Sequence, residues 1–234
     1  MSVVGTAGWS VPRAVAEAFP EQGSALERYA TVFDGVEINT SFYRRHQPKT
    51  WQRWADSVPE TFRFAVKIPK VISHELRLID AANELDVFLG DIAPLATKLG
   101  PLLLQLPPSL SFDAAGTEPF FAHLRQQFRA PVVIEPRHAS WATPQAAAFL
   151  ASFFIAPVLA DPSPPELEQF AATATHRYLR LHGSPRIYYS SYEAEQLEHY
   201  AELLTAPESW CIFDNTASGA ALANALQLKD MLRA

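Results

Sequence analysis

Charged and amide residues end nearly every apolar run in this chain, where they could carry acid–base chemistry. The runs that end in this way are V-E-I-N (36–39), F-A-V-K (64–67), L-L-L-Q (102–105), V-V-I-E-P-R (132–137), V-L-A-D (158–161), Y-L-R-L-H (178–182) and C-I-F-D-N (211–215). An ionisable side chain buried at the end of such a run costs free energy unless it is paired or used. Seven such ends that met at one rim would therefore form a functional site.

The phase of each run predicts which of these side chains share a face, because successive side chains of a strand point to opposite sides. Ten polar residues fall in the inward phase: Glu37, Asn39, Lys67, Gln105, Glu135, Arg137, Asp161, Arg180, His182 and Asp214. Residues of the opposite phase, such as Ile38, Val66 and Ile134, are mostly apolar. Paired buried charge contributes little stability, so ten such groups exceed what packing needs and favour a functional site. Static ion pairs, such as Glu135 with Arg137 or Glu37 with Lys67, are the alternative interpretation.

Acid–base catalysis is the chemistry that these residue types suit best. Two carboxylates with separated pKa values could serve as acid and base, a cation could stabilise an oxyanion, and an imidazole could shuttle protons. We assign catalytic roles to Glu37, Lys67, Glu135, Asp161, Arg180, His182 and Asp214. A Schiff base at Lys67 is disfavoured by the sequence, because it needs a lowered pKa and the carboxylates outnumber the cations.

A divalent metal ion is an alternative occupant of the same rim. Glu135, Asp161, His182 and Asp214 could supply oxygen and nitrogen ligands. The sequence has neither an H-E-x-x-H motif nor clustered cysteines, and three cations in the same set oppose a divalent ion. We therefore predict no cofactor and no metal ligand, and keep a divalent ion as the alternative.

Residues that could bind a substrate follow the strands. Residues 214–220 predict an anion site, because small residues leave backbone N–H groups accessible at a helix N-terminus, although ordinary N-capping is the alternative. Aromatic residues after the strands suit a sugar or a nucleobase, unless they only pack the loops. The residues assigned to substrate binding are Asn39, Tyr43, His74, Gln105, Arg137, Trp141, Tyr188, Asn215, Thr216, Ser218 and Gly219.

Eight short strands, each followed by a helical pattern, are predicted to position these residues. The strands cover residues 3–7, 36–39, 62–68, 102–106, 132–135, 157–161, 177–182 and 210–214. The helices cover residues 26–33, 50–55, 84–99, 120–128, 145–154, 165–171, 193–204 and 220–232, with Thr50 as an N-cap and Gly100 as a C-terminal stop. Strands that are apolar on both faces predict an α/β fold, here a compact TIM-type (β/α)8 barrel of parallel strands in one domain, residues 1–234. A doubly wound open sheet is the alternative.

Composition narrows the class of protein. A chain of 234 residues with 48% hydrophobic residues can bury one large core. Its net charge of -6 opposes non-specific nucleic-acid binding, which needs a basic field. The single cysteine, Cys211, excludes an internal disulfide and is expected in the core. With no signal-peptide pattern and no apolar run of membrane-spanning length, we expect a cytoplasmic protein without a membrane partner.

Nine motifs extend along almost the whole chain. They are G-T-A-G-W-S (5–10), V-E-I-N-T-S-F-Y (36–43), F-x-F-A-V-K-x-P (62–69), S-H (73–74), L-L-L-Q-L-P-P-S (102–109), E-P-R-H-x-S-W (135–141), A-D-P (160–162), Y-L-R-L-H-G (178–183) and I-F-D-N-T-A-S-G-A-A-L-x-N-A (212–225). Together they resemble the domain of unknown function 72 family, the YecE-like proteins. The resemblance implies a TIM-like barrel and carries no catalytic assignment.

We therefore expect an enzyme of the hydrolase or lyase type that acts on a small anionic compound, either phosphorylated or sugar-containing. A nucleic-acid-processing or nucleic-acid-binding barrel is one alternative, and it would use Arg44, Arg45, Lys67, Arg137 and Arg180. Its binding would weaken steeply as salt rises. A non-catalytic barrel that binds a metabolite is the other alternative. The oligomeric state is left open.

Overall fold

Nine parallel strands form the centre of the protein in a computed structural model that describes residues 2–172, 177–206 and 208–233. The strands are β1 (Val3–Thr6), β2 (Gly35–Ile38), β3 (Arg63–Lys67), β4 (Leu99–Gln105), β5 (Val132–Glu135), β6 (Ile155–Pro157), β7 (Leu159–Asp161), β8 (Tyr178–Leu181) and β9 (Trp210–Phe213). They make two sheets, with strand orders β1-β9-β8-β7 and β2-β3-β4-β5-β6. Every pairing within the two sheets is parallel.

The two sheets adjoin each other at two seams. At the first seam, Ala7 and Glu37 form a parallel bridge, and the Gly8 N–H donates to the Glu37 carbonyl at 2.9 Å. At the second seam, only Val158 separates β6 from β7, and its N–H donates to the Ile134 carbonyl at 2.8 Å. One extended segment therefore pairs with β5 in its first half and with β8 in its second half. This strand order confirms the predicted TIM-like barrel, with the sixth predicted strand divided into two.

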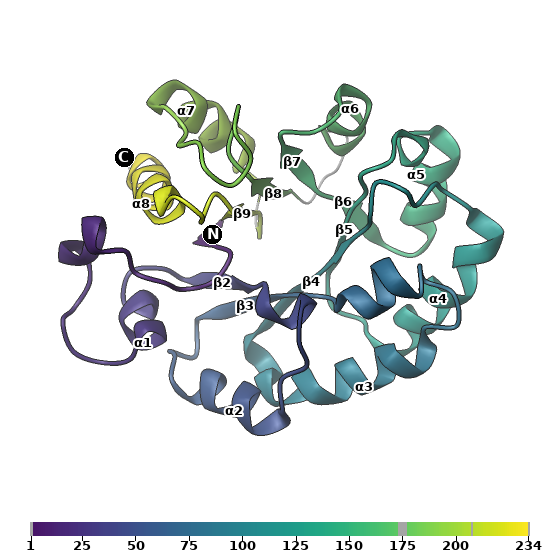
Figure 1. Ribbon diagram of the computed structural model, residues 1–234, viewed down its shortest axis with the longest axis horizontal. Helices are drawn as coiled ribbons and strands as arrows, with labels where there is room; N and C mark the ends of the chain where they lie inside the picture. The colour runs from purple at the N-terminus through teal and green to yellow at the C-terminus, as the bar shows by residue number, and fades with distance from the viewer. Residues whose placement is uncertain (1, 173–176, 207, 234) are drawn as a thin grey trace.

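Helices surround the strands, as Figure 1 shows. They are α1 (Ala25–Ala30), α2 (Pro48–Asp56), α3 (Ala82–Ile92), α4 (Ala114–Gln127), α5 (Pro144–Ser152), α6 (Pro165–Ala172), α7 (Ala194–Leu203) and α8 (Ala220–Met231). Shorter helical segments are η1 (Arg13–Ala18), η2 (Thr40–Phe42), η3 (Val71–Glu75), η4 (Ala93–Lys98) and η5 (Ala139–Trp141). The predicted alternation of strands and helices is confirmed. Among the described residues, no helix is both long and apolar enough to span a membrane.

Two predicted helix ends were wrong, each for a local reason. Thr50 does not cap α2, because the helix already begins at Pro48, whose fixed φ suits the first turn. Gly100 does not end a helix but lies in β4, since the preceding η4 is interrupted at Ala96, where φ is 49°. A Cβ on Gly100 would lie 2.9 Å from the ring of Trp210, so this glycine permits close packing between a strand and an aromatic ring.

The core has two layers, which matches the predicted phase of most strands. The larger layer lies between strands and helices and includes Phe64, Leu104, Ile134, Leu179 and Phe213. The smaller layer lies among the strands and consists of Ala65, Leu103, Val133, Val158, Ala160, Tyr178, Trp210 and Ile212. The polar strand ends that share a phase with this smaller layer therefore point into the barrel.

Candidate functional site

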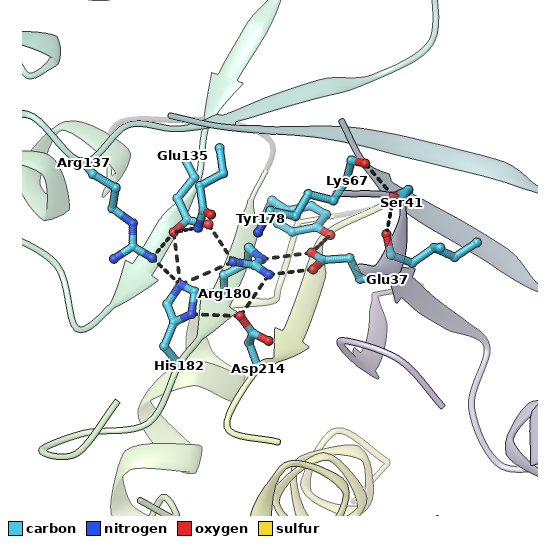
Figure 2. A network of polar contacts seen from close by, with 11 residues as sticks. Glu37, Ser41, Lys67, Glu135, Arg137, Tyr178, Arg180, His182 and Asp214 are labelled. Atoms are coloured by element: carbon cyan, nitrogen blue, oxygen red, sulfur yellow. Dashed lines mark hydrogen bonds and ion pairs between the residues drawn. The ribbon is translucent and has the colours of Figure 1, made fainter. Parts of the chain in front are cut away.

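Arg180, on β8, is the centre of a buried ion cluster at the C-terminal ends of the strands (Figure 2). Its guanidinium pairs with Glu37 through two bonds, Nη2 to Oε1 at 2.6 Å and Nε to Oε2 at 2.9 Å. Nη1 donates to Glu135 Oε2 at 2.9 Å, and Nη2 also contacts Asp214 Oδ2 at 3.1 Å. The side chain of Arg180 is fully buried, so these three carboxylates replace the water that would otherwise solvate it.

His182 lies between two of the same carboxylates. Its Nδ1 is 3.1 Å from Asp214 Oδ2, and its Nε2 is 3.1 Å from Glu135 Oε1. Burial lowers the pKa of an imidazole, but here Glu135 and Asp214 outweigh burial and raise the pKa of His182 above its usual value. The pKa of Glu135 is held well below its usual range, because Arg180, His182 and Arg137 together overcome the effect of burial.

Arg137 lies on the outer side of His182. Its Nη2 is 2.8 Å from His182 Nε2 and also contacts Glu135 Oε1. Gln105 donates from Nε2 to the same Glu135 oxygen at 3.0 Å. The side chain of Arg137 is 21% exposed, whereas those of Arg180 and His182 are fully buried. Arg137 is thus the cation through which the cluster reaches solvent.

The sequence prediction missed Tyr178. Its hydroxyl donates to Glu37 Oε2 at 2.9 Å, and its ring stacks on Trp210 with centroids 6.0 Å apart. Burial, together with the charge of Glu37, raises the pKa of Tyr178 well above its usual value, so the hydroxyl keeps its proton. Tyr178 lies two residues before Arg180 on the same strand, and this spacing could have identified it.

Lys67, at the end of β3, is the cluster member without a bonded partner. Figure 2 shows its side chain extending from β3 toward the middle of the cluster. Its Nζ forms no hydrogen bond or ion pair with any residue in the described ranges, and it lies 4.0 Å from the ring centroid of Phe42. The turn after β2 fixes the strand end, because the Ser41 hydroxyl contacts the Lys67 carbonyl at 2.6 Å. Burial and the nearby Arg180 lower the pKa of Lys67 to about 8.

Counting charges shows how these groups depend on one another. Three carboxylates, Glu37, Glu135 and Asp214, face two guanidiniums, Arg180 and Arg137. One further positive charge therefore makes the cluster neutral, and either His182 or Lys67 can carry it. The raised pKa of His182 and the lowered pKa of Lys67 both favour the imidazolium as its carrier.

Asp161 was predicted to face the interior, and this prediction was wrong. Ala156, Val158 and Ala160 pack inside the barrel, whereas Leu159 packs in the outer layer, so the phase of this segment is shifted by one residue. The carboxylate of Asp161 instead lies near α7, where burial and its negative charge raise the pKa of Tyr200. The structure therefore removes Asp161 from the acid–base cluster.

The aromatic and histidine residues predicted to bind substrate differ in where they lie: one is packed in the core, one is exposed, and two lie beside the ion cluster. Trp141 is fully buried and donates from its indole to the Leu110 carbonyl at 2.9 Å, so it is a packing residue and not a wall of the site. Tyr43 is 68% exposed, and Tyr188 lies edge-on to His182 with ring centroids 5.9 Å apart. His74 lies edge-on to Phe42, and burial and Lys67 lower its pKa. The structure thus brings Tyr188 and His74 to the cluster.

The loop after β9 is largely satisfied by the protein itself. The Asn215 amide is buried and donates to the Ser190 carbonyl at 2.9 Å and to Asn224 at 3.0 Å. The Gly219 N–H donates to the Thr216 carbonyl, and the Ser218 hydroxyl donates to Tyr189. These bonds hold the loop against the β8–α7 connection and leave fewer free donors for an anion than the sequence suggests. Asn39 lies at the turn after β2, where its Oδ1 is buried without a hydrogen-bond partner among the described residues.

Two of the residues proposed as metal ligands bond to protein side chains. Glu135 and Asp214 direct their oxygens at Arg180 and His182. Within residues 2–172, 177–206 and 208–233, no group of three or more His, Cys, Asp or Glu side chains is arranged to hold a metal ion.

Comparisons with known proteins agree with this architecture. The sequence model of a family described as "Protein of unknown function DUF72" matches residues 3–234. The chain belongs to the DUF72 family. This confirms the resemblance carried by the nine motifs.

Related sequences in this DUF72 family extend over different parts of the chain. UPF0759 protein YecE of Escherichia coli is 36% identical over 107 residues, which cover 46% of this chain and 38% of the length of YecE. UPF0759 protein YunF of Bacillus subtilis is 24% identical over 272 aligned positions, covering 99% of this chain and 95% of YunF.

Solved structures share the fold over the whole chain. A DUF72 protein of Thermotoga maritima is 27% identical, with a TM-score of 0.84 and full coverage of both chains. One from Enterococcus faecalis is 24% identical, with a TM-score of 0.80 and coverage of 100% of this chain and 96% of its own. The 3-keto-D-glucoside 4-epimerase YcjR of E. coli is 10% identical, with a TM-score of 0.52 and coverage of 99% and 98%, and it shares the fold alone.

Proposed function

We propose that this protein is an enzyme, of the hydrolase or lyase type, that performs acid–base chemistry on a small anionic compound. His182 is the proton shuttle, and Arg137 attracts the negatively charged part of the compound. Small anionic compounds, either phosphorylated or sugar-containing, are the substrates that this charge arrangement suits.

One observation carries the proposal, namely the two competing partners of His182 Nε2. A protonated Nε2 can donate to Glu135 Oε1 at 3.1 Å, whereas an unprotonated Nε2 can accept from Arg137 Nη2 at 2.8 Å. Nδ1 can donate to Asp214 in both states. The two arrangements differ by one proton, so the imidazole can gain or lose it without leaving a buried polar atom unbonded.

The nucleic-acid alternative has less support in the structure. Arg180 is fully buried against three carboxylates and cannot contact a phosphate backbone. Arg45 is exposed but forms two bonds with Asp91. The net charge of -6 also opposes non-specific binding to nucleic acid, which needs a basic field.

The test is turnover of a panel of small phosphorylated or sugar-containing anions, followed by mass spectrometry. We expect consumption of at least one compound by the wild-type protein and a loss of roughly 100-fold or more in His182→Gln. The control is His199→Gln, which changes an exposed histidine on α7 and should leave turnover unaltered.

The pH profile supplies a second readout. The limiting pKa should lie above the usual imidazole value of about 6.5, because Glu135 and Asp214 stabilise the imidazolium. Equal turnover by wild type and His182→Gln would refute the proposal. A compound that binds without being converted would show a metabolite-binding barrel instead.

A further inference from the structure

The amine of Lys67 has no bonded partner among the described residues, and it is not one of the completely buried atoms that lack a partner. The residue is 4% exposed, and no residue in the described part of the chain accepts a hydrogen bond from Nζ. Phe42 offers only the face of its ring, at 4.0 Å. An ammonium ion has three donors, so its burial here costs free energy that a neutral amine avoids.

Lys98 shows what a satisfied buried lysine looks like in the same protein. It is 7% exposed, and its Nζ donates to the carbonyls of Ala55 at 2.7 Å and Val58 at 2.9 Å. Glu60 adds an ion pair at 3.0 Å. Lys98 is therefore a structural lysine, and the two side chains differ in their partners rather than in their depth.

The carboxylates of the cluster do not hold Lys67 in its charged form. Glu37 and Glu135 act to raise its pKa, but both are bonded to Arg180, and burial together with Arg180 outweighs them. The pKa of Lys67 is about 8, which leaves a usable fraction of neutral amine near neutral pH. The sequence predicts the opposite, because the carboxylates outnumber the cations and would keep the amine of Lys67 charged.

Phe42 also lines a groove that Lys67 itself does not line. The groove has a volume of about 230 Å³, and Ser41, Phe42 and Tyr43 are among the residues that line it. Phe42 therefore has two contacts, the groove and the amine of Lys67.

We propose that Lys67 forms a Schiff base with a small anionic aldehyde or ketone. This inference rests on the proposed function and names its substrate class as carbonyl compounds. The unpaired amine of this buried residue, beside Phe42, carries it.

The covalent step balances without an added oxidant or reductant. The lone pair of neutral Nζ attacks the carbonyl carbon, and the carbonyl π electrons move to oxygen, which takes up a proton. The nitrogen loses its two protons overall, the oxygen leaves as water, and a C=N bond forms. The imidazolium of His182 belongs to the same cluster and can supply a proton, while Arg137 attracts the anionic group of the compound.

The experiment is trapping of the full chain with sodium borohydride in the presence of glyoxylate, pyruvate or dihydroxyacetone phosphate. Borohydride reduces the C=N bond to a stable secondary amine, which intact-mass measurement and peptide mapping can locate. We expect an adduct at Lys67 with at least one probe and a trapping rate that rises with pH toward a plateau above about 8.

Two variants keep this test decisive. Lys67→Arg keeps the positive charge but should lose the adduct, whereas Lys98→Met should keep it, because Lys98 is occupied by carbonyl oxygens. Adducts on exposed lysines only, or no adduct with any of the three probes, would overturn the inference.

The outcome also separates this inference from the proposed function. Turnover that depends on His182 without trapping at Lys67 would leave the acid–base proposal standing and refute the Schiff base. Trapping at Lys67 with turnover that is unchanged in His182→Gln would refute the acid–base proposal and support the Schiff base.

Discussion

The two ends of the barrel interior differ in chemistry although the same strands build both. Along β8, Tyr178 belongs to the apolar layer, and Arg180 is the next inward residue toward the C-terminal end. Along β9, Trp210 and Ile212 belong to the apolar layer, and Asp214 follows the strand. The apolar end stabilises the barrel by burial, whereas the charged end gains little net stability from its ion pairs. The proposed function would give the charged end a role that its small contribution to stability does not.

Removing the central cation should produce the largest effect. Arg180→Met leaves Glu37, Glu135 and Asp214 buried without their shared partner, and we expect a loss of roughly 3–5 kcal/mol in the free energy of unfolding. Urea unfolding at pH 7 would measure it, with the exposed Arg44→Met as a control that stays within about 0.5 kcal/mol. The loss should shrink at lower pH, because Arg180 holds the pKa of Glu135 and of Asp214 below the usual values and this contribution disappears once both are protonated. An unchanged stability would contradict the view that Arg180 compensates them.

A substitution at the apolar end should cost a similar amount but show no pH dependence. Trp210→Ala removes a buried side chain of the inner layer at the start of β9, and we expect a loss of roughly 3–5 kcal/mol. Urea titrations at pH 5, 7 and 9 should give the same difference from wild type. A difference that varied with pH would show that the two ends are not energetically separate.

The two buried lysines should respond to substitution in opposite directions. Lys67→Met removes an unpaired amine, and we expect a gain on the order of 3 kcal/mol at pH 7, together with loss of the proposed activity. Lys98→Met leaves the carbonyls of Ala55 and Val58 without their donor, and we expect a loss of roughly 1–3 kcal/mol.

The pH dependence of the Lys67→Met gain follows from the lowered pKa. Between pH 8 and about 10.5 the unfolded chain binds more protons than the folded chain, so the stability contributed by residue 67 in the wild type rises with pH. The advantage of Lys67→Met should therefore be full below pH 8 and decline across that window. Unfolding curves from pH 6 to 10 would measure it, and a stable difference across the range would contradict the lowered pKa.

Removal of the hydrogen bond between Tyr178 and Glu37, which joins the apolar end to the charged end, should have the smallest effect on stability. Tyr178→Phe keeps the stacking on Trp210 but removes the hydrogen bond to Glu37 Oε2, which Arg180 Nε continues to contact. We expect a loss of about 1.5 kcal/mol, measured by urea unfolding. Tyr29→Phe is a matched control, because the Tyr29 hydroxyl is also buried but bonds to Thr6 and the Gly35 carbonyl, away from the cluster. A loss of proposed activity in Tyr178→Phe alone would show that Glu37 must be held in place.

The barrel was predictable because its determinants are local. Short apolar runs that alternate with helical patterns already indicate parallel strands covered by helices, and the structure confirms this. The phase of β3, β5, β8 and β9 was also readable, since a charged residue at the strand end marks one face and bulky apolar residues mark the other. The segment of β6 and β7 lacked that contrast, because the small residues Ala156 and Ala160 face inward while Asp161 faces the helices.

The sequence by itself determined which strand ends carry charge, the family and the order of strands and helices. Only the tertiary structure decided which charges meet: Arg180 from β8 bonds to carboxylates from β2, β5 and the end of β9, and Lys67 is left without a partner. The physical reason is the separation in sequence over which each property is determined. Alternation along a strand is a local property with a period of two, whereas ion pairing across a barrel depends on how strands distant in sequence face one another.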